Sequence, residues 1–360
     1  MDTAQIDMIC NNVAHGDVAD RLIGTGGNVG MLRPWLGKDG RSYVTVLNQQ
    51  GQATKVLLQN ATATLSKGAW VKIDQAVAAE AQTPLRAVQD LRDRNLVESW
   101  SNGMATTIYQ SQKMSEAGSA IVSMDGLDQN PNDRVQSELV STPMPVISSG
   151  FNLSAREILA SQGSGMPLDT SGIGECARRV SETLEQLTIG TLAGPTYGAG
   201  SVYGYLTHPD INTATVSSPV VVTEPVWSGE SLLAEVNAMI AAAMADKHYG
   251  PYVLYYGPSW STYMNGEFKA ASDRTLAERL TAIDDLEAVR RLNYLEGYTL
   301  VLVQMTKSVV RLLSGMEIMT VQWDTQGGGL KHFKVMAIQA PQIRSTYGDR
   351  CGVVVATTAS

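Results

Sequence analysis

The stretch Gly150–Thr170 reads GFNLSAREILASQGSGMPLDT and joins a predicted strand to the clearest long helix of the chain. Ser154 and Glu157 have the spacing of a capping box, so we expect a short helix to begin at Ser154. The segment 163–165, GSG, should end that helix, and a polar residue at 169–171 should cap the next one. Ser164 does not stand in the G-x-S-x-G pattern of a nucleophile elbow, so the stretch predicts chain geometry and not catalysis.

The residues that follow predict an amphipathic helix over 172–190. Its apolar positions recur at spacings of four, three, four and three, which is the period of one helix face. These positions are Ile173, Ala177, Val180, Leu184 and Leu187. The charged residues fall mostly on other sides of the helix, and they are Glu175, Arg178, Arg179, Glu182 and Glu185.

The first part of the chain predicts short strands, one broken helix and a long hairpin. Strands fit 42–47, 55–58, 69–73 and 143–149, and a helix fits 74–95, capped by Asp74 and interrupted at Pro84. Two alternating segments, 104–111 and 119–124, predict a β-hairpin with a polar tip near 113–118. Such a hairpin is poorly stable alone, so its apolar side should rest on another surface, such as another subunit.

The second part alternates strands and helices before it ends in strands alone. Strands 219–223, 252–256 and 298–305 alternate with helices at 231–248 and about 275–292, which predicts a compact α/β lobe over about 200–310. Four further strands fit 309–313, 316–323, 331–338 and 351–357. The glycines at 327–329 predict a hairpin turn between the middle two.

Composition excludes several classes of protein. The 360 residues are 44% hydrophobic and 17% charged, and the net charge of -8 gives no basic surface for gripping nucleic acid. The three cysteines, Cys10, Cys176 and Cys351, are far apart, so we expect neither a disulfide framework nor a zinc site. No apolar run is long enough to span a membrane.

No motif in the chain carries a convincing chemical signature. GTGGNVG at 24–30 lacks the strand before it and the helix after it that a nucleotide-binding loop requires. DGLDQNPND at 125–133 lacks the glycine and glutamate of a calcium loop, and Asp284, Asp285 and Glu287 are best explained as a solvated helix face. The four histidines have no metal-binding spacing. We therefore expect no catalytic, metal or cofactor site, and no enzyme.

Taken in order, the segments resemble the major capsid proteins of tailed phages with the Hong Kong 97-type fold, especially their encapsulin-like branch. The resemblance spans about 63–350 and depends on order and spacing, because no single motif is diagnostic. The stretches that carry it include PMPVISSGFNLSAREILASQGSGMPLDT at 143–170, VYGYLTHPD at 202–210 and HYGPYVLYYGPSWSTYM at 248–264. Further stretches are ATLSKGAWVKIDQAV at 63–77, AVQDLRDRNL at 87–96 and AIVSMDG at 120–126.

The resemblance implies an α+β capsid fold with five parts. These are an N-terminal arm with short strands over 1–73, an N-terminal helix over 74–97, an extended β-hairpin loop over 98–127, a peripheral domain over 128–199 and 308–360, and an axial domain over 200–307. The helix at 172–190 corresponds to the spine helix of the peripheral domain.

The resemblance also implies that the arm and the extended loop contact neighbouring subunits. The residues expected there are Arg33, Trp35, Trp100, Met104, Ile108, Tyr109, Lys113, Met114 and Glu116. Some relatives cross-link a lysine of this loop to an asparagine of the peripheral domain. Lys113 could supply the amine, but no asparagine follows Asn293, so we expect no cross-link here.

The function implied is that of a structural major capsid protein, which assembles into hexamers and pentamers of an icosahedral phage head around double-stranded DNA. Portal, scaffold and decoration proteins are the further partners to consider, with no membrane partner, and the location is the virion, after assembly in the bacterial cytoplasm. The alternative is an encapsulin-type shell around a cargo enzyme, although the more than sixty residues before the helix at 74 favour a phage arm. A soluble α/β enzyme using the lobe at 200–310 is the third hypothesis.

Overall fold

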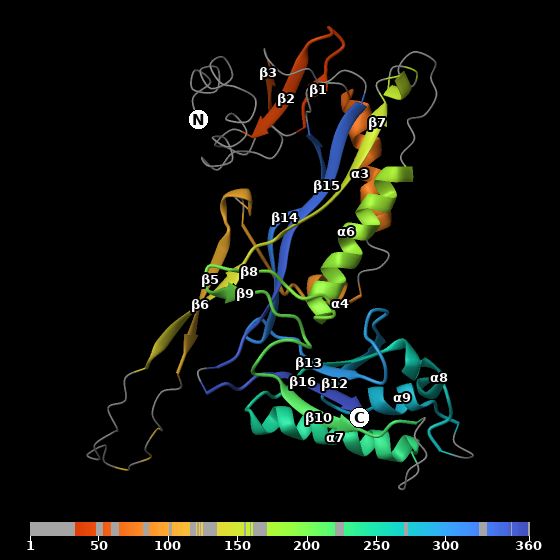
Figure 1. The fold of residues 1–360 in the computed structure, drawn as a ribbon. Helices are drawn as coiled ribbons and strands as arrows, with labels where there is room; N and C mark the ends of the chain where they lie inside the picture. The colour runs from red at the N-terminus through yellow and green to blue at the C-terminus, as the bar shows by residue number, and fades with distance from the viewer. Residues whose placement is uncertain are drawn as a thin grey trace.

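Two sheets with helices packed against them make up the body of the protein, and a thin hairpin projects from it (Figure 1). The computed structural model describes residues 33–47, 53–58, 65–81, 86–100, 103–115, 135–154, 171–219, 227–269, 273–323, 330–346 and 348–358, with 120, 122, 124, 156–158 and 160. None of the helices described there is long and apolar enough to cross a lipid bilayer.

The first sheet has four strands in the order β4 (Val97–Ser99), β14 (Val310–Trp323), β15 (Leu330–Ile343) and β7 (Val146–Ser154). The strands predicted at 309–313 and 316–323 form the single long strand β14, whose register shifts between Ser314 and Met319. β14 and β15 pair antiparallel up to Trp323 and His332, which confirms the predicted hairpin; its glycine turn at 327–329 lies outside the described residues.

Three helices lie against this sheet, namely α3 (Lys67–Ala81), α4 (Ala87–Asp93) and α6 (Ser171–Ile189). The buried apolar residues of these helices and of the four-stranded sheet form one cluster, which we call the first core. The apolar stripe predicted on α6 is confirmed, because all five of its side chains are buried in this core. The predicted capping box is also confirmed: the Ser154 N–H donates to Glu157 Oε2 at 3.0 Å, and Ser154 Oγ accepts from the Arg156 N–H at 3.2 Å. The segment 161–170 lies outside the described residues.

The prediction of a strand at 69–73 and a helix capped by Asp74 is wrong. Helix α3 begins at Lys67, and Ser66 Oγ accepts the Ala69 N–H at 3.2 Å, so Ser66 caps the helix. Trp70, Ile73 and Val77 are buried at a helical spacing, which overrides the strand preference of the β-branched residues among them. The expected interruption near Pro84 is confirmed, since α3 and α4 are separate helices on either side of it.

The second sheet has five strands in the order β10 (Asn212–Val216), β16 (Val353–Thr358), β13 (Leu300–Gln304), β11 (Tyr252–Tyr256) and β12 (Leu286–Arg291). Alternate residues of β13 enter two different cores: Val301 and Val303 join the first core, and Leu300 and Leu302 join the second. The second core lies between the five-stranded sheet and helix α7 (Gly229–Ala245) (Figure 1). The 3-10 helix η3 (Pro258–Trp260) and helices α8 (Ser261–Met264) and α9 (Leu276–Thr281) also contribute buried residues to this core.

Two expectations for this lobe need correction, and a third lies mostly outside the described residues. The helix expected at about 275–292 is only α9, because 286–291 form edge strand β12, whose pairing with β11 overrides a helix-favouring composition. Strand β10 at 212–216 was not expected, and the strand expected at 219–223 lies, apart from residue 219, outside the described residues. Strand β16 was expected with the late strands of the first sheet, but it pairs with β10 and β13.

Three small sheets complete the described structure. One joins β1 (Trp35–Leu36), β2 (Ser42–Leu47) and β3 (Ala53–Leu57), and another pairs β8 (Thr196–Tyr197) with β9 (Gly200–Ser201). In the projecting hairpin, β5 (Ile108–Met114) pairs with β6 (Ser137–Pro143), preceded by 3-10 helix η2 (Gly103–Ala105). The expected return strand at 119–124 is wrong: its described residues, 120, 122 and 124, are not in a strand. The loop between β5 and β6 is longer than predicted, but a longer loop costs little extra closure entropy. The strand that pairs with β5 therefore need not be the first alternating segment that follows it.

The α6 stripe gives a direct test of the first core. We expect Leu184→Ala to lower the free energy of unfolding by about 2–5 kcal/mol, because Leu184 is fully buried and its truncation leaves a cavity. Urea unfolding of the unassembled protein measures this loss. Arg179→Ala on the exposed side of the same helix is the control, and we expect it to change stability by no more than about 0.5 kcal/mol. Equal effects of the two variants would contradict the assignment of the buried face.

Candidate functional site

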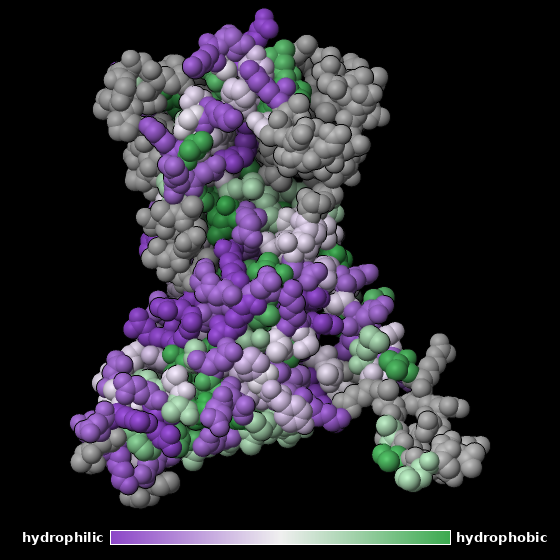
Figure 2. All heavy atoms as spheres, turned by 180° about the vertical axis from the view of Figure 1, so that it is seen from behind, coloured by the Kyte–Doolittle hydropathy of each residue, from purple (hydrophilic) through white to green (hydrophobic). Residues whose placement is uncertain are grey.

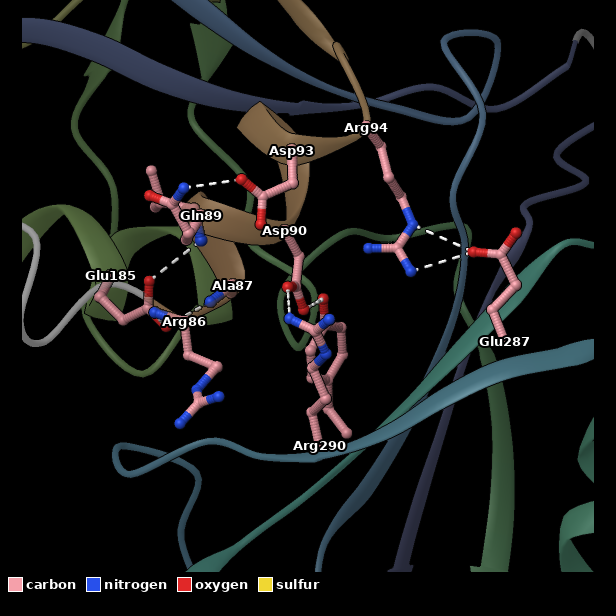
Figure 3. Close-up of polar contacts among 11 residues, drawn as sticks. Arg86, Ala87, Gln89, Asp90, Asp93, Arg94, Glu185, Glu287 and Arg290 are labelled. Atoms are coloured by element: carbon pink, nitrogen blue, oxygen red, sulfur yellow. Dashed lines mark hydrogen bonds and ion pairs between the residues drawn. The ribbon is translucent and has the colours of Figure 1, made fainter. Parts of the chain in front are cut away.

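A buried carboxylate joins two helices at the centre of the molecule (Figure 3). Glu185 of α6 is 1% exposed, although the helix pattern placed it outside the apolar stripe. Its Oε1 accepts the backbone N–H groups of Arg86 and Ala87 at 3.0 and 2.7 Å, and its Oε2 accepts that of Val88 at 3.1 Å. These are the unpaired N–H groups at the start of α4, where a negative charge is favoured. Glu185 is therefore the N-terminal cap of a helix about 100 residues away in sequence.

A second buried carboxylate connects α4 to the five-stranded sheet. Asp90 is fully buried, forms an ion pair with Arg290 of β12 and accepts a hydrogen bond from the Tyr255 hydroxyl of β11 at 2.7 Å (Figure 3). Burial raises the pKa of Asp90, and the Tyr255 hydrogen bond and the Arg290 charge oppose that shift. Burial likewise raises the pKa of Glu185, against the three N–H donors. Both carboxylates are occupied by partners within the protein, which suits a structural role.

The arginines of α4 extend the same junction to its surface. Arg94 contacts Glu287 of β12 at 3.0 Å, and Arg92 contacts Glu317 of β14 at 2.8 Å and the Gln339 side chain of β15 at 3.3 Å. Helix α4 thus bridges α6 and both sheets. The carboxylate of Glu287 was expected on a solvated helix face with Asp284 and Asp285, but it lies on strand β12.

The projecting hairpin is attached to the body at its root. The rings of Trp100 and Tyr109 stack with centroids 5.4 Å apart, and the Arg311 guanidinium lies 5.2 Å from the Tyr109 centroid. Gly103 crosses β14 so closely that an added Cβ would lie 2.2 Å from the Gly315 carbonyl oxygen, so glycine is required there. Met104 packs partly buried against the first core, and Ile108 lies beside Gly198 of the β8–β9 turn.

Lys113 lies farther along the hairpin, and its charge is neutralised within the chain. Its Nζ lies 2.8 Å from Asp349 Oδ1 and 3.3 Å from Asp210 Oδ2, and its side chain is 13% exposed. Burial acts to lower the pKa of Lys113, but its hydrogen bonds to Asp349 and Asp210 outweigh burial and raise it. For Asp210, burial acts to raise the pKa, and the hydrogen bonds from Ser345 and Lys113 outweigh it and lower the pKa. A protonated, paired amine is a poor nucleophile, and the expectation of no cross-link stays a prediction.

These pKa directions define a pH range for the cluster. A lowered aspartate pKa stabilises the fold above the ordinary aspartate value, and a raised lysine pKa stabilises it below the ordinary lysine value. The contribution is lost as pH falls through the folded-state pKa of Asp210 or rises through that of Lys113. The contacts of Lys113 are therefore complete throughout the neutral range.

The hairpin carries the most exposed apolar residues among those described. Met114 is 58% and Leu139 62% exposed, and four further apolar residues of β6 and of the segment between β5 and β6 add to them. These additional exposed residues are Val122, Met124, Val135 and Val140. Figure 2 shows the hydrophobic residues on the projecting end of the molecule. Met114 was among the contact residues predicted from sequence, but Leu139 was missed because the return strand was placed too early; SELVSTP has no period-two alternation that would have identified the strand.

The remaining predicted contact residues lie mainly in contacts within the chain. Arg33 forms an ion pair with Asp74 and lies 4.6 Å over the Trp70 ring, and Trp35 stacks on Tyr43 at 5.2 Å. Glu116 lies outside the described residues, as do His15, the glycine segment 24–30 and the acidic loop 125–133. Within the described ranges, no group of three His, Cys, Asp or Glu side chains could hold a metal ion. The structure therefore brings the hairpin residues together, and leaves the arm residues at a separate sheet.

Comparison with protein families finds one match over most of the chain. The model of a family of unknown function, DUF6260, matches residues 60–356. No curated protein matches the sequence.

Comparison with solved structures finds capsid-like shells. The structure is similar to the virus-like particle of Pyrococcus furiosus, with 15% identity, a TM-score of 0.56, and coverage of 80% of this chain and 99% of that chain. It is also similar to the capsid of Myoviridae phage XM1, with 11% identity, a TM-score of 0.55, and coverage of 76% and 93%. A third similar structure, from Mycobacterium phage Bobi, has 12% identity, a TM-score of 0.53, and coverage of 78% and 94%. The predicted α+β fold of the Hong Kong 97 capsid type is confirmed.

Glu185 gives the test of the junction. We expect Glu185→Gln to lower the free energy of unfolding by about 1–3 kcal/mol, because an amide nitrogen cannot accept the Val88 N–H. Glu185→Ala should cost more, since three N–H groups lose their acceptor. Glu182→Gln, one helical turn away and partly exposed, should stay within about 0.5 kcal/mol of the parent in urea unfolding. If Glu185→Gln and Glu182→Gln behaved alike, Glu185 would not be a structural cap.

Proposed function

The chain belongs to the DUF6260 family and has the fold of tailed-phage capsid proteins, and from this premise we propose that it is a capsid shell protein. In this role it is a structural protein and performs no catalytic step. The observation that carries the proposal is the extent of the likeness: the fold covers 76–80% of this chain and 93–99% of the shell proteins compared.

We propose that copies of the chain form hexamers and pentamers that close into an icosahedral phage head. Closed symmetry requires each copy to present the same surfaces to its neighbours. The hairpin supplies one such surface, because Met114 and Leu139 are apolar and exposed in the single chain. Burying them against a second copy removes apolar area from water, which favours association. Of the contact residues predicted from sequence, Met114 fits this role most directly; the others remain predictions.

We further propose that the shell encloses double-stranded DNA by proximity and not by specific recognition. The net charge of -8 supports this view, because tight binding of DNA requires Lys and Arg to replace phosphate counterions. Portal, scaffold and decoration proteins are candidate partners, and the virion is the proposed location.

The alternative is a nanocompartment shell that encloses a cargo enzyme. Residues 1–59, which precede the family match, favour a phage head with an N-terminal arm over this alternative. The contents of purified shells distinguish the two, since one carries DNA and the other carries a protein cargo.

The first experiment is electron microscopy of the protein expressed alone, with light scattering on the same sample. We expect closed shells or rings of five and six copies. A protein that stays monomeric or dimeric at high concentration, also with the other structural proteins of its own virus added, would contradict the proposal.

A second experiment tests the hairpin surface. We expect Leu139→Asp to reduce the yield of shells at least about tenfold, because a charge on an apolar contact must be desolvated on assembly. Leu139→Met is the matched control, since it keeps an apolar side chain of similar volume, and it should assemble normally. Sedimentation measures shell yield, and circular dichroism of unassembled protein verifies the fold. Normal assembly of Leu139→Asp would exclude Leu139 from the subunit contact.

A further inference from the structure

In a strand pair packed on its own core, the apolar side chains face the body and the polar ones face solvent. In this hairpin, polar side chains face the body, and Met114 and Leu139 face solvent. Residues directly opposite each other in β5 and β6 share a face, so Ser111 and Lys113 point to the same side as Tyr109 and Thr142. Val140 also lies on this side, which is turned toward the body, and is 40% exposed; Met114 and Leu139 on the other side are 58% and 62% exposed. Beyond the root, the hairpin is thus held to its own chain by polar groups and presents apolar groups outward.

Polar contacts fasten the inner side of the hairpin to the end of β15. The Gln342 amide donates to the hydroxyls of Thr142 at 2.9 Å and Ser111 at 3.2 Å, and Arg344 donates to the Gln112 carbonyl at 3.3 Å. Lys113 is the outermost of these fasteners, one pair before the end of the described ladder at Met114 and Ser137.

The two partners of Lys113 lie where the chain passes between the sheets. Asp349 occupies the tight turn between β15 of the four-stranded sheet and β16 of the five-stranded sheet. Asp210 lies two residues before β10 of the five-stranded sheet, and it also accepts a hydrogen bond from the hydroxyl of Ser345, which lies between β15 and β16. The Lys113 ammonium therefore binds the hairpin to the segments that connect the two sheets.

We propose that Lys113, Asp210 and Asp349 form an electrostatic latch, which fixes the angle of the hairpin relative to both sheets and is released by salt. An apolar core contact would strengthen or persist at high salt, whereas the ion pair of Lys113 with Asp349, whose side chain is 74% exposed, is screened. The consequence of the latch rests on the proposed function: it holds the apolar outer side of the hairpin in position to contact a second copy of the chain. The latch itself is a property of the single chain.

Hydrogen–deuterium exchange of the unassembled protein tests the latch without reference to assembly. We expect Lys113→Met to speed exchange of 108–114 and 137–143 about tenfold, as the loss of a partly buried ion pair predicts. Helix α6 should exchange at the parental rate. Glu138→Gln is the matched control, because Glu138 lies opposite Lys113 on β6 but is absent from its ion pairs, and it should leave exchange unchanged.

Salt and a second variant complete the test. Raising NaCl from about 0.05 to 1 M should speed hairpin exchange in the parent and have little effect in Lys113→Met. Asp349→Asn should reproduce part of the effect, and asparagine tolerates the positive φ of 56° at this position. If Lys113→Met also speeds exchange of α6, the variant has disturbed the whole fold. In that case the exchange of the hairpin in Asp349→Asn tests the latch, because the Asp349 side chain is 74% exposed.

The outcomes separate the two proposals. Hairpin exchange that is unchanged in both variants and at high salt would overturn the latch. Faster hairpin exchange in a protein that never assembles would leave the latch intact and remove the capsid proposal. Faster exchange together with a lower yield of shells from Lys113→Met would support both.

Discussion

The three hydrogen bonds from the start of α4 to the Glu185 carboxylate hold the rest of the structure in place. Through them the longest helix is joined to a helix of seven residues, and that short helix then reaches both sheets through Asp90, Arg92 and Arg94. A helix this short has little stability of its own. Its position therefore depends on the carboxylate that caps it, and the relative placement of the two sheets depends on that helix.

Periodic patterns allowed much of the fold to be predicted from sequence. The stripe on α6, the strand at 252–256 and the hairpin of β14 and β15 all carry strong local signals, and each was found as expected. The errors occurred where a distant partner decides the local structure. Residues 286–291 have a helix-forming composition but pair with β11, and residues 69–73 have β-branched residues but bury one side of α3.

The candidate site was less predictable, because the role of each of its residues depends on contacts with residues far away in the sequence. Glu185 had the appearance of a solvated charge, and only the position of α4 turns it into a cap. Lys113 could be identified as a notable lysine of the hairpin, yet its partners Asp210 and Asp349 are 97 and 236 residues away. Predicting that Leu139 faces outward required recognising strand β6. That strand was missed because 22 residues separate it from β5.

The place of β16 has a consequence for how the chain folds as it is made. This strand lies between β10 and β13, and its side chains enter both cores: Val353 and Val355 the first, Val354 and Ala356 the second. Neither core can be completed until residues 353–358 have left the ribosome. Contacts of such long sequence separation form slowly. The nascent chain therefore leaves the apolar sides of both unfinished cores exposed until its last residues emerge, and it is most prone to aggregation in that interval.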